Sequence, residues 1–141
     1  MPSPSRTYPT PAPSKETCNG MIASLRDALY VVGGKWKLPI ISALRGGPLR
    51  FNELQAALGT ITPKILSKEL KELELNEFVN RTVYATSPVT VEYELTEYSR
   101  SLEKVVIELS NWGSQHKKRL KDCAKAKRAA AAEQKAKTTS R

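Results

Sequence analysis

At 141 residues, of which 40% are hydrophobic, the chain is long enough for one domain with a modest core and short extensions. No segment approaches the roughly 18 consecutive apolar residues of a membrane span, and the Pro-, Ser- and Thr-rich start lacks the apolar centre of a secretory signal. Cys18 and Cys123 are too far apart in sequence to suggest a disulfide framework. We therefore expect a cytoplasmic protein that does not contact a membrane.

The net charge of +9 is concentrated at the C-terminal end. Residues 117–141 hold ten Lys or Arg and two acids and carry +8, whereas the other 116 residues carry only +1. Lys/Ala-rich segments are typically solvated helices or disordered tails that attract phosphates without sequence preference. Residues 121–141 are therefore predicted to be a basic tail, and any sequence-specific DNA binding has to come from the domain before it.

The N-terminal part divides into an arm and two helices. Residues 1–16 contain five of the nine prolines and are predicted to be a disordered arm, with the domain itself over residues 17–120. Apolar residues recur at helical spacing over 21–32, which predicts a helix that Gly33 and Gly34 end. A second helix is expected over residues 35–44, followed by a break at Gly46-Gly47-Pro48.

A pair of helices joined by a short turn comes next. The first is predicted over residues 51–58 and the second over 62–76, where Thr62-Pro63 has the pattern of a helix start: a capping hydroxyl followed by a proline. This is a helix-turn-helix candidate. Helical hairpins are also common in proteins that do not bind DNA, so the pattern alone does not decide the function.

A β-hairpin is predicted directly after this pair. Residues 79–85 and 89–95 have strand character, and Thr86-Ser87-Pro88 separates them as a turn. A hairpin in this place is the wing of a winged helix. Thr96 is expected to cap a long final helix, with Glu97 in its first turn. The predicted fold class is mainly α with a small β-hairpin wing (α+β): a winged helix-turn-helix.

The helix over residues 62–76 is amphipathic in a way that suits DNA. Three leucines cluster on one side, three lysines at i, i+4 and i+7 cluster on the other, and the acids lie away from the lysines. Lysines can contact phosphates or guanine edges, and short hydroxyls can bond phosphate or base. Exposed lysines are ordinary on amphipathic helices too, so both interpretations stay open. The predicted DNA-contacting residues here are Thr62, Lys64, Ser67, Lys68 and Lys71.

Three further DNA-binding candidates flank this helix. Arg50 precedes the first helix of the pair, and Arg81 and Tyr84 lie on the predicted hairpin. In a winged helix these places approach the sugar-phosphate backbone. Pairing of Arg81 with Glu92 or Glu94 across the hairpin is an alternative of equal weight.

These motifs resemble the HxlR family of winged-helix regulators, which is related in fold to the MarR regulators. The matching strings are GGKWKLPII (33–41), LRFNEL (49–54), ITPK (61–64), LSKELKEL (66–73), RTVY (81–84) and VEYELT (91–96). The resemblance extends over about residues 28–112. It implies a homodimeric transcription regulator that binds double-stranded DNA, with its recognition helix over 62–76, its wing over 81–94 and a dimer interface built by the terminal helices. Glu77 and Ser99 stand where the family usually has glycine.

Two apolar faces on the first and last helices exceed what one small core can bury, which predicts a homodimer. Two-fold symmetry would place two recognition helices about 34 Å apart, so we expect an inverted-repeat operator. The regulator is expected to be a repressor, with an activator as the alternative. The predicted interface residues are Met21, Ile22, Leu25, Leu29, Leu102, Val105, Val106, Leu109 and Trp112.

Catalytic, cofactor and metal sites are not expected. The sequence has no phosphate loop and no metal-ligand spacing, and its single histidine, His116, has no Cys or Ser partner placed by a pattern. The family resemblance adds a regulatory hypothesis, because some relatives sense quinones, aldehydes or oxidants through a cysteine at the start of the first helix. Cys18 is the candidate sensor, and an unreactive small residue at the edge of the interface is the alternative. A small electrophile or an apolar molecule is therefore the expected inducer.

Two other function classes stay open at this point. A winged helix used for protein–protein assembly would need no cationic stripe, and a basic RNA- or nucleoid-associated protein would act through its tail. Removal of residues 121–141 separates these classes. A tail-driven protein would lose its affinity, whereas a protein that binds through helix and wing would keep its sequence preference.

Overall fold

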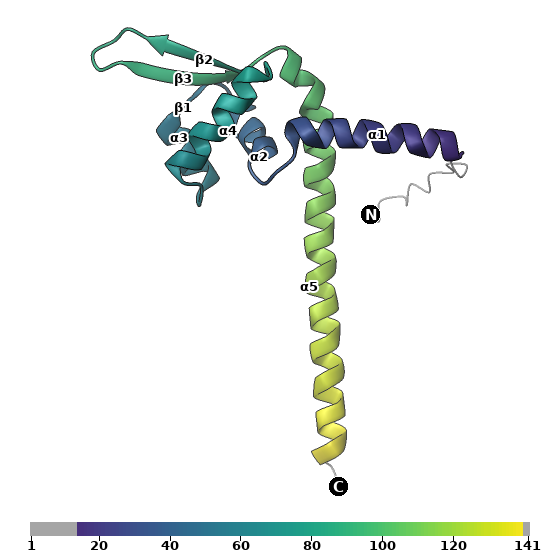
Figure 1. The fold of residues 1–141 in the computed structure, drawn as a ribbon. Coiled ribbons are helices and arrows are strands. Elements are labelled where there is room, and N and C mark those ends of the chain that lie inside the picture. The colour runs from purple at the N-terminus through teal and green to yellow at the C-terminus, as the bar shows by residue number, and fades with distance from the viewer. Residues whose placement is uncertain (1–13, 140–141) are drawn as a thin grey trace.

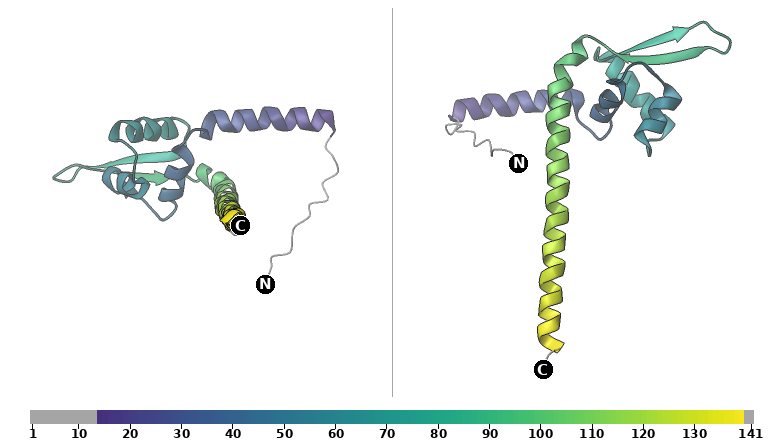
Figure 2. Two further views of the ribbon diagram at one scale, coloured as in Figure 1. Left: turned by 90° about the horizontal axis from the view of Figure 1, so that it is seen from below. Right: turned by 180° about the vertical axis from the view of Figure 1, so that it is seen from behind.

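The computed structural model describes residues 14–139 as a small winged unit from which two long helices project (Figure 1). The elements are α1 (Lys15–Val32), α2 (Lys37–Leu44), β1 (Leu49–Arg50), α3 (Phe51–Leu58), α4 (Pro63–Leu75), β2 (Val79–Tyr84), β3 (Thr90–Leu95), the 3-10 helix η1 (Tyr98–Leu102) and α5 (Glu103–Thr139). The β2–β3 hairpin points away from the winged unit on the side opposite to α1 (Figure 2). The predicted winged helix-turn-helix fold is confirmed.

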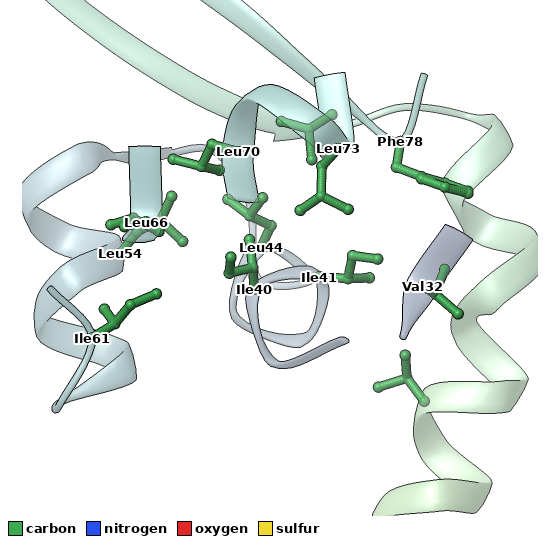
Figure 3. Packing of buried hydrophobic residues seen from close by; sticks show 12 residues of the cluster. Val32, Ile40, Ile41, Leu44, Leu54, Ile61, Leu66, Leu70, Leu73 and Phe78 are labelled. Carbon is green, nitrogen blue, oxygen red and sulfur yellow. The ribbon is translucent and has the colours of Figure 1, made fainter. Parts of the chain in front are cut away.

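The core lies where α2, α3 and α4 meet the base of the sheet (Figure 3). On α4 the buried residues are three leucines at i, i+4 and i+7, so one face of this helix is fixed in the core, where α4 contacts α2 and β2. Replacing such a leucine with alanine typically costs about 3–5 kcal/mol. The buried residues are Val32, Ile40, Ile41, Leu44, Leu54, Ile61, Leu66, Leu70, Leu73, Phe78, Val79 and Val106.

Both ends of α4 are set by local hydrogen bonds. At its start the Thr62 hydroxyl accepts a hydrogen bond from the Ile65 N–H (3.3 Å), as Thr62-Pro63 predicts. At its end the Phe78 N–H donates to the Leu73 carbonyl at 2.9 Å, and the Glu77 N–H donates to the Glu74 carbonyl at 3.0 Å. This is a Schellman motif, which needs a left-handed residue just after the helix.

Glu77 is that left-handed residue, with φ of 64°. A residue with a Cβ pays roughly 1–2 kcal/mol for this conformation, which explains why glycine is usual at this position in the family. The Thr96 hydroxyl donates to the Glu77 carbonyl at 2.6 Å and helps to hold the turn. Ser99 is the second residue that stands where the family usually has glycine. It is buried, and its hydroxyl donates to the Thr96 carbonyl.

The sheet has three antiparallel strands in the order β1-β3-β2. β2 ends at residue 84 and β3 begins at residue 90, each one residue short of the prediction at the tip of the wing. At the predicted turn between them, the Thr86 hydroxyl donates to the Pro88 carbonyl at 2.8 Å. The two-residue strand β1 was not predicted, because so short a segment has no detectable alternation.

Some predicted helix boundaries are wrong. α1 begins at Lys15 rather than residue 21, because the Ser14 hydroxyl accepts a hydrogen bond from the Thr17 N–H (3.2 Å) and caps it. Residues 14–16 are therefore not part of a disordered arm, and the rest of that predicted arm lies outside the described residues. α2 begins at Lys37 instead of residue 35.

The last helix also differs from its prediction. Thr96 accepts a hydrogen bond from the Ser99 N–H (3.2 Å), but it starts η1, and α5 itself begins only at Glu103. α5 then continues past residue 121 without a break to Thr139, so the basic segment is helical as far as it is described. None of the helices described over residues 14–139 is long and apolar enough to cross a membrane.

Candidate DNA-binding surface

The outer face of α4 is exposed to solvent. Its three lysines lie on the side opposite to the buried leucines, and the two hydroxyl residues are exposed with them. The structure therefore brings the predicted residues of this helix together on one surface. These exposed residues are Thr62, Lys64, Ser67, Lys68 and Lys71.

Two of the acids of α4 form ion pairs with a lysine of α2. The Lys37 ammonium lies 2.7 Å from a carboxylate oxygen of Glu69 and 2.7 Å from one of Glu72. The Lys37 side chain is 12% exposed, so this is a partly buried contact between the two helices. Both carboxylates pair with Lys37 on α2, and the charge of Lys68 on the outer face also acts on Glu72, whose side chain is 40% exposed.

The pKa values follow from this contact. Burial alone would lower the pKa of Lys37, but the hydrogen bonds and charges of Glu69 and Glu72 outweigh it, so the pKa of Lys37 is raised above its usual 10.5. The hydrogen bond from Lys37, followed by its charge, holds the pKa of Glu72 below its usual 4.5. Lys37 and Glu72 are therefore both charged at neutral pH.

The wing candidates are exposed, but they lie on different faces of the sheet. Arg81 stands opposite Tyr93, while Thr82 stands opposite Glu92, so Arg81 and Glu92 project to opposite sides. The ion pairs of residues 14–139 do not include Arg81, and the alternative of a cross-strand pair is thus not formed.

Arg50 and Tyr84 share the face opposite to Arg81. Arg50 is the register partner of Glu92 on β3, and Tyr84 pairs with Thr90 two positions farther along. The Arg50 side chain is 60% exposed, and its nearest carboxylate, that of Glu53, lies 4.0 Å away. At this distance and exposure the ion pair is weak. The small sheet therefore has cationic or polar groups on both faces. Such a sheet can contact the sugar-phosphate backbone of DNA with either face.

Apolar side chains remain uncovered on the two projecting helices. On α1 the four predicted interface residues are 54–64% exposed, and on α5 Val105, Leu109 and Trp112 are 47–61% exposed. Sequence reasoning did not single out Tyr30, which is 93% exposed on the other side of α1. The exposed α1 residues of the predicted interface are Met21, Ile22, Leu25 and Leu29.

One predicted interface residue, Val106, is corrected. Val106 is only 7% exposed, and Leu102 is partly buried; both pack against the chain's own core. Their helical spacing with Val105 and Leu109 marks an apolar face, but it does not distinguish a core contact from a subunit contact. Val106 therefore stabilises the single chain instead, whereas Leu102 stays a predicted interface residue.

The fold agrees with the comparisons to known proteins. A family model described as HxlR-like helix-turn-helix matches residues 31–121. The chain belongs to this family. The resemblance found in the motifs is thereby confirmed, together with the class of helix-turn-helix transcription regulators.

Individual relatives agree with the family assignment. The chain is 45% identical over 93 residues to the HTH-type transcriptional regulator YtcD of Bacillus subtilis, covering 66% of this chain and 74% of that protein. It is 39% identical over 97 residues to the HTH-type transcriptional regulator YodB of the same organism, covering 69% of this chain and 87% of that protein. The solved structure of the redox regulator HypR in its reduced form superposes with a TM-score of 0.66 at 37% identity, covering 70% of this chain and 98% of that one.

Proposed function

We propose that this chain acts as a homodimeric repressor that binds an inverted-repeat operator through α4 and the wing. The outer face of α4 is the observation that carries the proposal. Its lysines and hydroxyl residues are exposed, its opposite side is fixed in the core, and Lys37 on α2 forms ion pairs with two of its acids. A helix held rigidly in this way can place cations and short polar groups against base edges.

The uncovered faces of α1 and α5 support the homodimer. Large apolar side chains that stay half exposed in one chain are costly in water, and burial against a second copy removes this cost. A two-fold axis would then present two α4 helices about one DNA turn apart. The operator is accordingly expected to have half-sites with centres about 10 base pairs, or a multiple of that, apart.

Selection of bound sequences from a random DNA pool tests this proposal. We expect enrichment of an inverted repeat. The double variant Ser67→Ala, Lys68→Ala should lose roughly 10- to 100-fold in operator affinity relative to random DNA, since one good base contact contributes about 1–3 kcal/mol. Lys121→Ala is the control, and it should weaken binding to operator and random DNA equally.

The salt dependence separates the roles of Lys68. If this lysine contacts only phosphate, its loss will flatten the salt slope by about one unit and leave the preference unchanged. Equal affinity of the double variant and the parent for the selected operator would contradict the proposal, because the outer face of α4 would then not face DNA.

A response to oxidants or electrophiles is the regulatory part of the proposal. Cys18 is partly buried in the first turns of α1, the helix that carries half of the proposed interface. The relatives include HypR, solved in oxidised and reduced forms, and YodB, solved after diamide treatment. An adduct at Cys18 would change the tilt of the subunits and the spacing of the two α4 helices, which lowers the affinity for both half-sites together.

Operator binding after exposure to diamide or a quinone tests Cys18. We expect release for the parent and for Cys123→Ser, and retention for Cys18→Ser. Release that persists in Cys18→Ser rules out this residue as the sensor. If no variant is released, the inducer is a small apolar molecule or the regulator is controlled by its abundance.

A further inference from the structure

The C-terminal half of α5 extends beyond the part of the chain that the family model matches, which ends at residue 121. α5 is 37 residues long, and at 1.5 Å per residue it measures about 55 Å. It leaves the winged unit and projects alone through its lower half (Figures 1 and 2). All residues of α5 from 107 to 139 are exposed. This segment is therefore a surface without a role in the winged unit.

Its basic residues are not spread evenly around the helix. Nine Lys or Arg lie between residues 117 and 139, and at 3.6 residues per turn six of them fall within an arc of about 100°. The other three, Arg119, Lys127 and Lys137, lie on the far side, and the acids Asp122 and Glu133 lie outside the arc. We call the six the basic face of α5: Lys117, Lys118, Lys121, Lys125, Arg128 and Lys135.

The charge of the basic face is uncompensated. Within residues 14–139, no basic side chain after Arg100 takes part in an ion pair. The face also lies opposite to the exposed apolar side of α5, which begins with Val105, Leu109 and Trp112. The proposed packing of that apolar side against a second copy would thus leave the basic face pointing outward.

The composition of the face selects its partner. An interfacial membrane helix needs large apolar side chains, and none follows Leu120. A single-strand binding surface needs aromatic groups on which bases stack, and the last aromatic residue of α5 apart from His116 is Trp112. A line of cations about 27 Å long instead matches the phosphates along about eight base pairs of duplex.

We propose that the basic face of α5 is a second DNA-binding surface, separate from α4, which holds the phosphate backbone of duplex DNA without sequence preference. It adds affinity for all duplex DNA, while the choice of operator remains with α4. The inference goes beyond the proposed function, because either surface can bind DNA when the other fails to do so.

Two matched triple variants of the full-length protein test it. The first removes three cations of the basic face: Lys121→Ala, Lys125→Ala, Arg128→Ala. The second removes the three on the far side: Arg119→Ala, Lys127→Ala, Lys137→Ala. Each loses two lysines and one arginine, so the net charges are the same, and alanine maintains the helix. Circular dichroism and sedimentation check helix content and oligomeric state.

The measurement is the affinity for a 30-base-pair duplex of random sequence as a function of salt. We expect the first variant to lose about 2–3 units of the salt slope, close to 0.9 for each lost phosphate contact, and at least tenfold in affinity at low salt. The second should lose less than one unit. Equal losses would show that only net charge matters, and no loss in either would show that the face does not bind DNA; both results overturn the proposal. A loss of operator preference in the first variant would overturn the separation from α4.

Discussion

The two lysine-rich helices, α4 and α5, differ in how firmly the rest of the fold holds them. On α4, buried leucines and the contact with Lys37 hold the helix in one orientation, and exposed hydroxyl residues accompany the cations. On α5 the cations lie on a helix whose end projects into solvent. Cations fixed beside short polar groups can distinguish bases, whereas cations on a projecting helix attract any phosphate chain. A basic helix that the core holds in one orientation can therefore recognise a base sequence, whereas a projecting one recognises only phosphates.

The largest effect is expected at the proposed dimer contact, because that contact holds two copies of α4 and two copies of α5 on the same DNA. Leu109→Asp places a charge in the exposed apolar side of α5, where a second copy would have to bury it. Dimers should dissociate, and operator affinity should fall by more than 100-fold because the two half-sites are no longer held together. Light scattering and operator titration measure the two effects. A parent that is monomeric at micromolar concentration would contradict the dimer.

A second prediction concerns the support behind α4. Lys37→Met leaves Glu69 partly buried without its cation and should lower the free energy of unfolding by about 1–2 kcal/mol. Lys104→Met, at an exposed position of α5, is the control and should change it by less than about 0.5 kcal/mol. Urea unfolding measures both. Equal changes would show that the Lys37 contact does not stabilise α4.

The same contact predicts a pH dependence. The lowered pKa of Glu72 means that its contribution is present above its usual 4.5 and is lost as pH falls through the folded value. The raised pKa of Lys37 means that its contribution is present below its usual 10.5 and is lost as pH rises through the folded value. The difference in stability between parent and Lys37→Met should therefore be largest near neutral pH and shrink in acid.

The smallest effect is expected at the end of α4. Glu77→Gly removes the cost of the left-handed conformation and should raise the free energy of unfolding by about 0.5–1 kcal/mol. Glu74→Gly, inside the helix, should lower it by about 1 kcal/mol. If Glu77→Gly instead lowers the free energy of unfolding as much as Glu74→Gly does, the left-handed backbone at Glu77 is not strained.

The parts of the molecule that could be predicted are those set by local patterns. The cap at Thr62, the leucine spacing of α4 and the wing turn at Thr86 depend on residues within one or two turns of each other. The early start of α1 was missed because it depends on a single cap at Ser14 and the residues after it show no apolar periodicity.

The parts that could not be predicted depend on how elements cross. The contact of Lys37 with Glu69 and Glu72 requires α2 to lie against α4, which no local pattern indicates. Val106 is a core residue because the first turn of α5 packs on the winged unit, although its spacing on the helix equals that of an interface residue. The position of Arg50 and Tyr84 on one face of the sheet follows only from the strand register.

The most direct test of the account compares two affinity ratios. Binding to the selected operator and to random duplex is measured for the parent, for the Ser67→Ala, Lys68→Ala variant and for the variant lacking Lys121, Lys125 and Arg128. The α4 variant should lose most of its operator-to-random ratio, while the α5 variant should keep the ratio of the parent with both affinities reduced. An unchanged ratio in the α4 variant, or a collapsed ratio in the α5 variant, would contradict the assignment of recognition to α4.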